Sequence, residues 1–182
     1  MKPLHIAASN NNARVFRALL EAGAEPQAER WDGTTALHVI ASEYFQGQTL
    51  AEELISRAPD LVHSKSSLET PLSTAIRNVD FELANLLRKK GADINQLLGP
   101  HQTSTVLFQV LAGGSTQDLD LEKLRYPLAM PEIDFVLAPR QRYTALHAAV
   151  VLRARYSLET LSAPSTLNHS LKILLERWHS KS

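Results

Sequence analysis

The stretch Leu72–Asn95 reads LSTAIRNVDFELANLLRKKGADIN and contains two short helical patterns separated by a turn. Immediately before it, Thr70 can cap a helix with its hydroxyl, and Pro71 fits the first helical position, where its missing N–H costs nothing. The second half has apolar residues spaced three and four apart, at Leu83, Leu86 and Leu87. That spacing predicts a helix with one apolar side, which Gly91 can end in a left-handed conformation. The stretch therefore predicts a helix–turn–helix unit.

The start of this unit recurs along the chain. Related frames are KPLHIAAS from Lys2, TALHVIAS from Thr35, TPLSTAIR from Thr70, TVLFQVLA from Thr105 and TALHAAVV from Thr144. Their fourth positions are His5, His38, Ser73, Phe108 and His147, so the successive steps are 33, 35, 35 and 39 residues. A period in the range of about 20–50 residues is typical of stacked repeat architectures.

These frames, together with the L-L-x-x-x-G-A ending of Leu86–Ala92, resemble the ankyrin repeat. The resemblance implies an all-α dominated repeat solenoid, in which helix–turn–helix units stack and short β-hairpin fingers connect them. It implies a single domain over residues 1–182, with repeats at about 1–32 (partial), 33–67, 68–102, 103–141 and 142–182. Insertions are expected near 119–130 and 155–168.

Several positions depart from the family pattern. Ser73 and Phe108 replace histidine, Val79 replaces the glycine of the turn between helices, and Leu68 stands where a finger usually has glycine. A lost hydrogen bond costs on the order of 1 kcal/mol, and the stability of stacked repeats is approximately a sum of local contributions. The fourth repeat, with Phe108 and an insertion, is therefore expected to be the least stable.

Composition excludes some classes of protein. The formal net charge is zero, which argues against a general polyanion binder, so nucleic acid is not an expected partner. Residues 136–182 nevertheless carry seven Lys/Arg against two Asp/Glu, which could steer an acidic partner or could be ordinary solvated surface. The absence of cysteine excludes disulfides and thiolate metal sites.

Targeting signals are not found in the sequence. No apolar run approaches the ~20 residues of a membrane span, and residues 1–3 lead directly into a repeat helix rather than a secretory signal. We expect an intracellular protein, in the cytoplasm or the nucleus. Because the first repeat lacks a preceding finger and the last ends soon after its second helix, the chain is expected to be a fragment of a longer protein, or one whose neighbouring domains supply an activity.

The seven histidines do not form a metal-site pattern. His5, His38 and His147 occupy the frame position, where the resemblance implies that the imidazole joins the first helix to backbone and to the neighbouring repeat. The other four are scattered, and none has the i, i+4 spacing of a zinc-binding helix. No nucleophile elbow, phosphate loop or dinucleotide fingerprint is present. We expect no metal, no cofactor and no catalysis.

Binding positions follow from the resemblance. In ankyrin repeats the variable binding positions lie seven, six and four residues before the frame position, and four and five residues after it. On this chain the candidate partner-binding residues, including one neighbour in the last finger, are Trp31, Asp32, Thr34, Ser42, Glu43, Arg77, Asn78, His101, Arg140, Arg142 and Tyr143.

Some of these residues have two interpretations. Trp31 is either an interface hot spot, for which tryptophan is a preferred residue, or it packs against the adjacent finger. Arg140, Arg142 and Tyr143 form either a binding patch or a solvated basic tip. Leu97 and Leu98 are either exposed for contact or folded back onto the stack. Asn95 matches the asparagine that a hydroxylase modifies in some ankyrin sequences, and it is also the common structural choice there.

The leading functional hypothesis is a non-catalytic protein–protein interaction scaffold that binds through its concave face. The partner would be another protein or an adjacent domain of the same chain, docking on a preformed surface. The alternative is a regulatory or targeting ankyrin segment of a larger multidomain enzyme or signalling protein. A third hypothesis is nucleic-acid or anionic-lipid binding through the basic residues of the C-terminal part.

Overall fold

The computed structural model describes residues 2–43, 47–99, 104–112, 126–127 and 129–134. The backbone contacts divide the chain into two units. The first unit comprises residues 1–93 and 98–100, and the second comprises residues 94–97 and 101–182. One domain over 1–182, with the repeat boundaries given above, stays a prediction.

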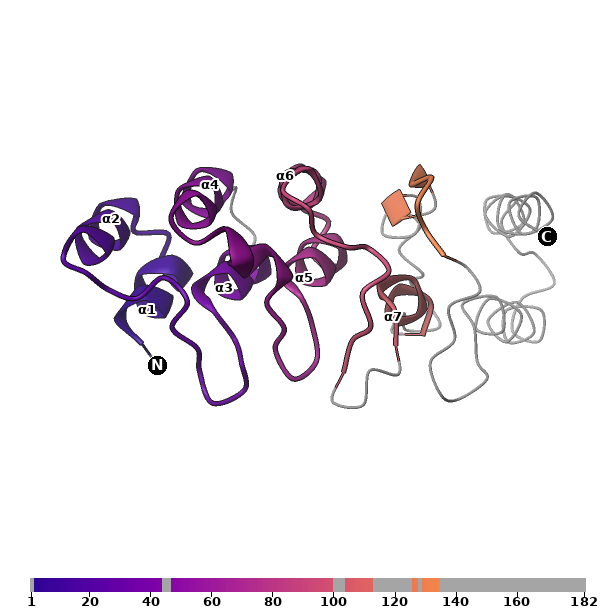
Figure 1. Cartoon of the computed structure of the whole chain (residues 1–182), viewed down its shortest axis with the longest axis horizontal. Helices are drawn as coiled ribbons and strands as arrows, with labels where there is room; N and C mark the ends of the chain where they lie inside the picture. Colours follow the sequence, from indigo (N-terminus) through magenta and orange to yellow (C-terminus); the bar gives the residue numbers. More distant parts are fainter. Residues whose placement is uncertain (1, 44–46, 100–103, 113–125, 128, 135–182) are drawn as a thin grey trace, which may run out of the picture. The chain divides into compact units, whose positions relative to one another are not determined.

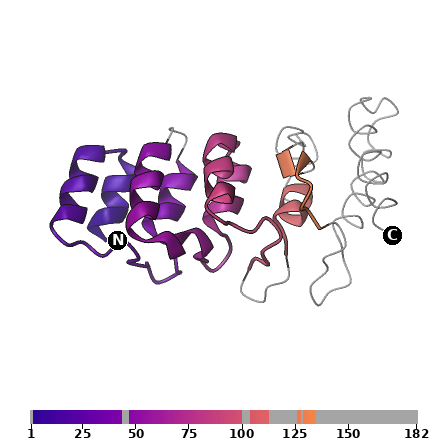
Figure 2. The ribbon, with the colours of Figure 1, turned by 45° about the horizontal axis from the view of Figure 1, so that its top comes forward.

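The first unit is built from helix pairs. The pairs are α1 (Pro3–Ser9) with α2 (Ala13–Glu21), α3 (Ala36–Ser42) with α4 (Gln48–Arg57), and α5 (Pro71–Arg77) with α6 (Phe81–Lys89); the 3-10 helix η1 (Pro59–His63) follows α4. Within this unit α1, α3 and α5 form one row and α2, α4 and α6 a second row (Figure 1), as the tilted view in Figure 2 also shows. Contacts join α1 to α3, α3 to α5, and α4 to α6. The all-α repeat predicted from the frames is confirmed in this unit.

The helices begin and end where local chemistry predicts. Pro3 and Pro71 are the first residues of α1 and α5. The Thr70 hydroxyl accepts a hydrogen bond from the Ser73 N–H at 3.1 Å, which satisfies one of the free donors at a helix start. After the second helices, Gly23 and Gly91 have φ angles of 86° and 102°, a left-handed conformation that glycine adopts at little cost. These sequence predictions are confirmed.

The turn between α5 and α6 contains a non-glycine residue in the left-handed region. Val79, in the place of the usual turn glycine, has a φ of 62°, and Asn11 in the first pair has a φ of 48°. Asparagine tolerates this conformation, whereas a β-branched residue there is an outlier. The turn is therefore imposed on valine by the packing of the two helices it connects.

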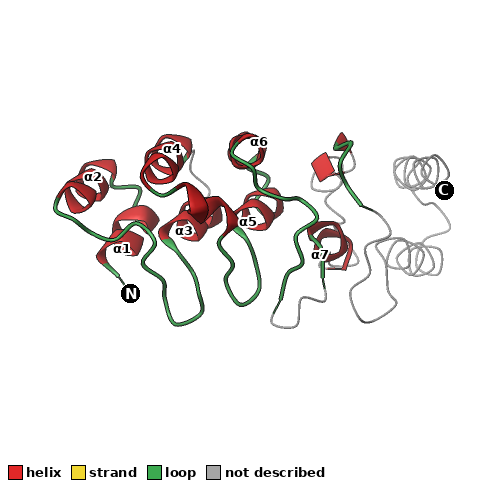
Figure 3. Cartoon of the chain, viewed as in Figure 1, coloured by secondary structure: helices red, strands yellow, loops and turns green. Residues whose placement is uncertain are grey.

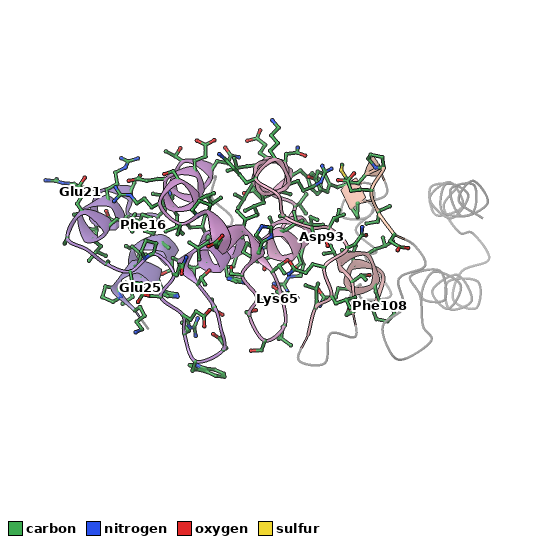
Figure 4. All side chains as sticks on the ribbon, viewed as in Figure 1. Phe16, Glu21, Glu25, Lys65, Asp93 and Phe108 are labelled. Atoms are coloured by element: carbon green, nitrogen blue, oxygen red, sulfur yellow. The ribbon has the colours of Figure 1, made fainter. Side chains whose placement is uncertain are left out.

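The core of the first unit lies between the two rows of helices. Phe16 of α2 is fully buried and points into the unit (Figure 4). The predicted apolar stripe of α6 is buried at Leu83 and Leu87. In α2, apolar residues with similar spacing are covered only in part, because Leu20 is buried whereas Val15 is 45% exposed. The apolar side is therefore buried less completely in α2 than in α6.

The connections between helix pairs in the first unit are loops, and no strand occurs in the part of the chain that the structure describes (Figure 3). The loop before α3 closes with Gly33 N–H donating to Arg30 O at 3.0 Å, and the loop before α5 with Ser66 N–H donating to Glu69 O at 2.9 Å. The fingers therefore contain hydrogen-bonded turns, and their hairpin form stays a prediction.

The described part of the second unit contains α7 (Val106–Ala112). The Thr105 hydroxyl accepts from the Phe108 N–H at 3.2 Å, so the fourth frame begins a helix as the first three do. Asn95 donates to Glu132 O and accepts from the Asp134 N–H, both at 2.7 Å. These two bonds give the Asn95 side chain a structural role in joining its loop to the segment near residue 133.

Candidate functional site

The loop of residues 30–34, named here the Trp31 finger, is a rigid turn. Arg30 N–H donates to Thr34 O at 2.9 Å, and Asp32 Oδ1 accepts from the Thr34 N–H at 3.0 Å. Burial would raise the pKa of Asp32, but the hydrogen bonds from Thr34 and the charge of Arg30 outweigh it and lower that pKa below 3.8. Asp32 is therefore a carboxylate that holds the turn.

The loop of residues 65–69, named the Leu68 finger, reaches a similar shape with different chemistry. The Ser66 hydroxyl oxygen accepts from the Glu69 N–H at 3.1 Å and donates to Glu69 O at 3.2 Å. It also accepts from the Leu68 N–H at 3.4 Å. A serine side chain thus organises this turn, as short hydroxyl side chains do in many tight turns.

The two fingers are joined to each other. Ser67 donates to Asp32 O twice, from its N–H at 2.8 Å and from its hydroxyl at 2.9 Å. Gly33 has a φ of 78°, and a Cβ at that position would lie 2.8 Å from Lys65 O. The backbones approach so closely that only glycine fits there. The residues next to Trp31 and Leu68 are consequently in direct contact.

Frame histidines anchor the base of each finger. His5 Nε2–H donates to Thr34 O at 2.9 Å, and His38 Nε2–H donates to Glu69 O at 3.3 Å. His38 Nδ1 accepts from the Thr35 N–H at 3.2 Å. The structural role predicted for these two histidines is confirmed, while His147 lies outside the described residues.

Burial controls the charge of His38. The side chain is 4% exposed, and desolvation lowers its pKa to about 4, with Asp32 opposing the shift and His5 adding to it. His38 is therefore neutral at pH 7, which leaves Nδ1 free to accept a hydrogen bond. Its Nε2–H is the donor to Glu69 O at the base of the Leu68 finger.

Ser73 forms only one of the two kinds of hydrogen bond that a frame histidine forms. Its hydroxyl oxygen accepts from the Thr70 N–H at 2.9 Å, as His38 Nδ1 does for Thr35, but it donates to Thr70 O within the same turn. A serine side chain is too short to reach the next finger in the way that His5 and His38 do. The departure noted in the sequence thus preserves the helix start and gives up the bond between repeats.

Two large apolar side chains are displayed on the joined finger tips. Trp31 is 91% exposed and Leu68 is 62% exposed. The alternative that Trp31 packs against the adjacent finger is wrong, because so exposed a side chain buries almost nothing. Leu68 was not predicted as a binding residue. It could have been found from the sequence, because a leucine stands there in place of the glycine that is usual in a finger. Together they form an exposed apolar pair on a fixed backbone.

Two other described candidates lie at the C-terminal end of α5. Arg77 is exposed and forms an ion pair with Glu69, whose second carboxylate oxygen accepts from Thr74 Oγ1 at 2.8 Å. The Asn78 amide donates to Ala41 O at 3.0 Å, which gives it a role in stacking α5 on α3. Their participation in binding stays a prediction.

The remaining described candidates lie at the C-terminal end of α3. Ser42 is exposed and donates to Val39 O at 2.8 Å, and Glu43 is the half-buried residue at the end of the helix. His101, Arg140, Arg142 and Tyr143 lie outside the described residues. Leu98 is 2% exposed, so of its two interpretations the folded-back one is correct.

Among the described residues, the candidate site is the exposed surface of the two fingers. Among the described residues no group of three or more His, Asp or Glu side chains could hold a metal ion. No described helix combines the length and the apolar character needed to cross a bilayer. What the fingers do provide is a pre-organised apolar pair beside a carboxylate–guanidinium pair, a combination suited to contact with another protein surface.

Comparison with known proteins agrees with the repeat frames. A family model for ankyrin repeats, in three copies, matches residues 2–97. This range contains all three helix pairs of the first unit and both fingers. No curated protein matches the chain. Because the family model covers more than half of the 182 residues, the chain belongs to the ankyrin repeat family.

Proposed function

We propose that this chain is a non-catalytic interaction module that binds a partner protein through its finger tips and the exposed flank of its first helices. Ankyrin repeats generally mediate protein–protein interaction. The observation that carries the proposal is the exposed pair Trp31 and Leu68 on two fingers joined at Asp32 and Ser67. Contiguous exposed apolar patches mark contact sites of proteins, and tryptophan is enriched among interface hot spots.

Rigidity supports the same proposal. Each finger is closed by its own turn bonds and held at its base by a buried histidine, so little backbone freedom is lost when a partner docks. Trp31 would act as the central anchor, because tryptophan buries a large area and dominates interface energetics. Arg77 would lie at the rim, where its ion pair with Glu69 keeps the guanidinium oriented.

Affinity capture with mass spectrometry tests the proposal. The bait is compared with the double variant Trp31→Ser/Leu68→Ser and with Glu52→Ala, which changes an exposed residue on α4, in the other row of helices. We expect partners to be lost from the double variant and retained by Glu52→Ala. Retention of every partner by the double variant would place the binding surface elsewhere.

For a partner identified in this way, the single change Trp31→Ala should weaken binding by at least about 2 kcal/mol, or roughly thirtyfold in Kd, as expected for a hot-spot residue. Isothermal titration calorimetry measures the change. A loss below about 0.5 kcal/mol would show that Trp31 lies outside the interface.

A further inference from the structure

Each finger is attached at its base to a different first helix. His5 of α1 donates to a carbonyl of the Trp31 finger at 2.9 Å, and His38 of α3 donates to a carbonyl of the Leu68 finger at 3.3 Å. The two fingers project from the same side of the first row of helices (Figure 1). The histidine bonds fix the base of each finger, but they do not by themselves fix the two tips with respect to each other.

Ser67 joins the fingers close to both tips. Its N–H donates to Asp32 O at 2.8 Å, and its hydroxyl donates to the same oxygen at 2.9 Å. A carbonyl oxygen has two lone pairs and can accept both donors. Asp32 follows Trp31 in the chain, and Ser67 precedes Leu68. The two bonds therefore connect the residues next to the exposed side chains.

The second donor adds direction to this joint. A single N–H bond would allow one finger to rotate about the bond, whereas two donors from one residue on one oxygen restrict that rotation. The backbones are also close beside the joint, because a Cβ on Gly33 would lie 2.8 Å from Lys65 O. Since each tip residue is covalently bonded to a residue of the joint, a rotation at the joint would displace both tips.

The hydroxyl of Ser67 matters more for recognition than for folding. Ser67 is exposed, and a hydrogen bond that water can replace adds little to the stability of the fold. A partner that contacts both tips must find them in one arrangement, however. Freedom that is lost before docking lowers the cost of association, so a bond that fixes the tips favours binding.

We propose, on the basis of the function proposed above, that Ser67 is a positioning residue of the binding surface. Its hydroxyl holds Trp31 and Leu68 in the arrangement that a partner contacts. Ser67 acts through Asp32 O and not through a contact of its own with the partner.

Amide hydrogen exchange in the free chain tests the joint without any partner. The Ser67 N–H donates to Asp32 O, so its exchange requires the joint to open. In Ser67→Ala the amide at position 67 should exchange at least about threefold faster, after correction for the intrinsic rate of alanine, because one of the two bonds is lost. Ser67→Thr keeps a hydroxyl and should stay within about twofold of the parent. Ser56→Ala is the matched control, since Ser56 is also exposed and its hydroxyl donates to Glu53 O within α4 at 2.7 Å.

The same variants are then compared in binding to a partner found by affinity capture, with isothermal titration calorimetry. Ser67→Ala should weaken the Kd by about fivefold, whereas Ser67→Thr and Ser56→Ala should stay within about twofold of the parent. Far-UV circular dichroism checks that each variant folds. Faster exchange and weaker binding in Ser67→Ala, with recovery of both in Ser67→Thr, would support the positioning role.

The other outcomes would overturn the positioning role. Unchanged exchange in Ser67→Ala would show that the hydroxyl does not hold the joint, and weaker binding in that case would assign Ser67 a direct contact with the partner. Faster exchange with an unchanged Kd would show that the joint does not serve binding. A Ser67→Thr variant that behaves like Ser67→Ala would show that the hydroxyl is not the group that matters. If Trp31→Ala leaves the Kd unchanged, the proposed function fails as well, whereas a failure of Ser67→Ala alone leaves the binding role of Trp31 and Leu68 intact.

Discussion

The Trp31 finger and the Leu68 finger have the same position between successive helix pairs but are held by different means. The first depends on Gly33 in a left-handed conformation and on the Asp32 carboxylate. The second has no positive φ and depends on the Ser66 hydroxyl. Both receive a histidine Nε2 donor at their base. The two fingers therefore share the histidine hydrogen bond that joins one repeat to the next. The turn at the tip can be closed either by a glycine and a carboxylate or by a serine hydroxyl.

Acidification should weaken the base of the Leu68 finger most. Between about pH 6.5 and about pH 4 the unfolded chain binds a proton at His38 and the folded chain does not, since burial holds its folded pKa near 4. The free energy of unfolding therefore falls as the pH falls through this window, by about 3 kcal/mol in total. Urea unfolding at a series of pH values measures the slope.

The control for this prediction is His38→Gln, which keeps a polar side chain without a titrating ring. Its overall stability should be lower, but its pH dependence between 6.5 and 4 should be flatter than that of the parent. Equal slopes in the two proteins would assign the effect to other groups. Asp32 contributes below this window, because its lowered pKa adds stability that is lost only as the pH falls below 3.8.

A methyl group at Gly33 should damage the first finger and not the second. In Gly33→Ala the new Cβ would lie 2.8 Å from Lys65 O with φ at 78°, so we expect a loss of about 2 kcal/mol in the free energy of unfolding. The equivalent change in the second finger, Leu68→Ala, should cost less than about 0.5 kcal/mol because Leu68 is exposed. Chemical denaturation of both variants measures the two losses in the free energy of unfolding. Equal losses would contradict the prediction.

The features predicted correctly from the sequence are those encoded over a few residues. Thr70 with Pro71, the terminating Gly91 and the spacing of Leu83 and Leu87 each specify local geometry by themselves. The role of His38 was also predicted, but through the family resemblance rather than through spacing. Short-range patterns therefore predicted the helix pairs of the first unit, whereas the repeat period and the family resemblance predicted that the pairs stack.

The features that were missed depend on contacts across repeats. Ser67 bonds Asp32 O, 35 residues away, and no local pattern encodes that contact. Leu68 becomes an exposed tip residue only because Ser66 forms the turn without a glycine. In the same way, the partial exposure of Val15 depends on what lies beside α2 and not on the periodicity of α2 itself.

Removal of the Ser66 hydroxyl should loosen the second finger alone. Ser66→Ala loses the bonds to Leu68 N and to both backbone groups of Glu69, which water can partly replace at a half-buried site. We expect a loss of about 1 kcal/mol in the free energy of unfolding. Amide hydrogen exchange should become faster at Leu68 and Glu69 and stay unchanged at Thr34. Equal acceleration in both fingers would show that they open as one unit.

The smallest effect on folding should come from the two exposed tips. Trp31→Ala and Leu68→Ala remove side chains that bury little, so each should change the free energy of unfolding by less than about 0.5 kcal/mol. A larger loss from Trp31→Ala would mean that the ring packs on the fold in solution and is not presented to a partner. If neither variant changes the free energy of unfolding but both weaken partner binding, the tip side chains serve binding alone. The histidine bonds at the base of the fingers would then serve stability alone.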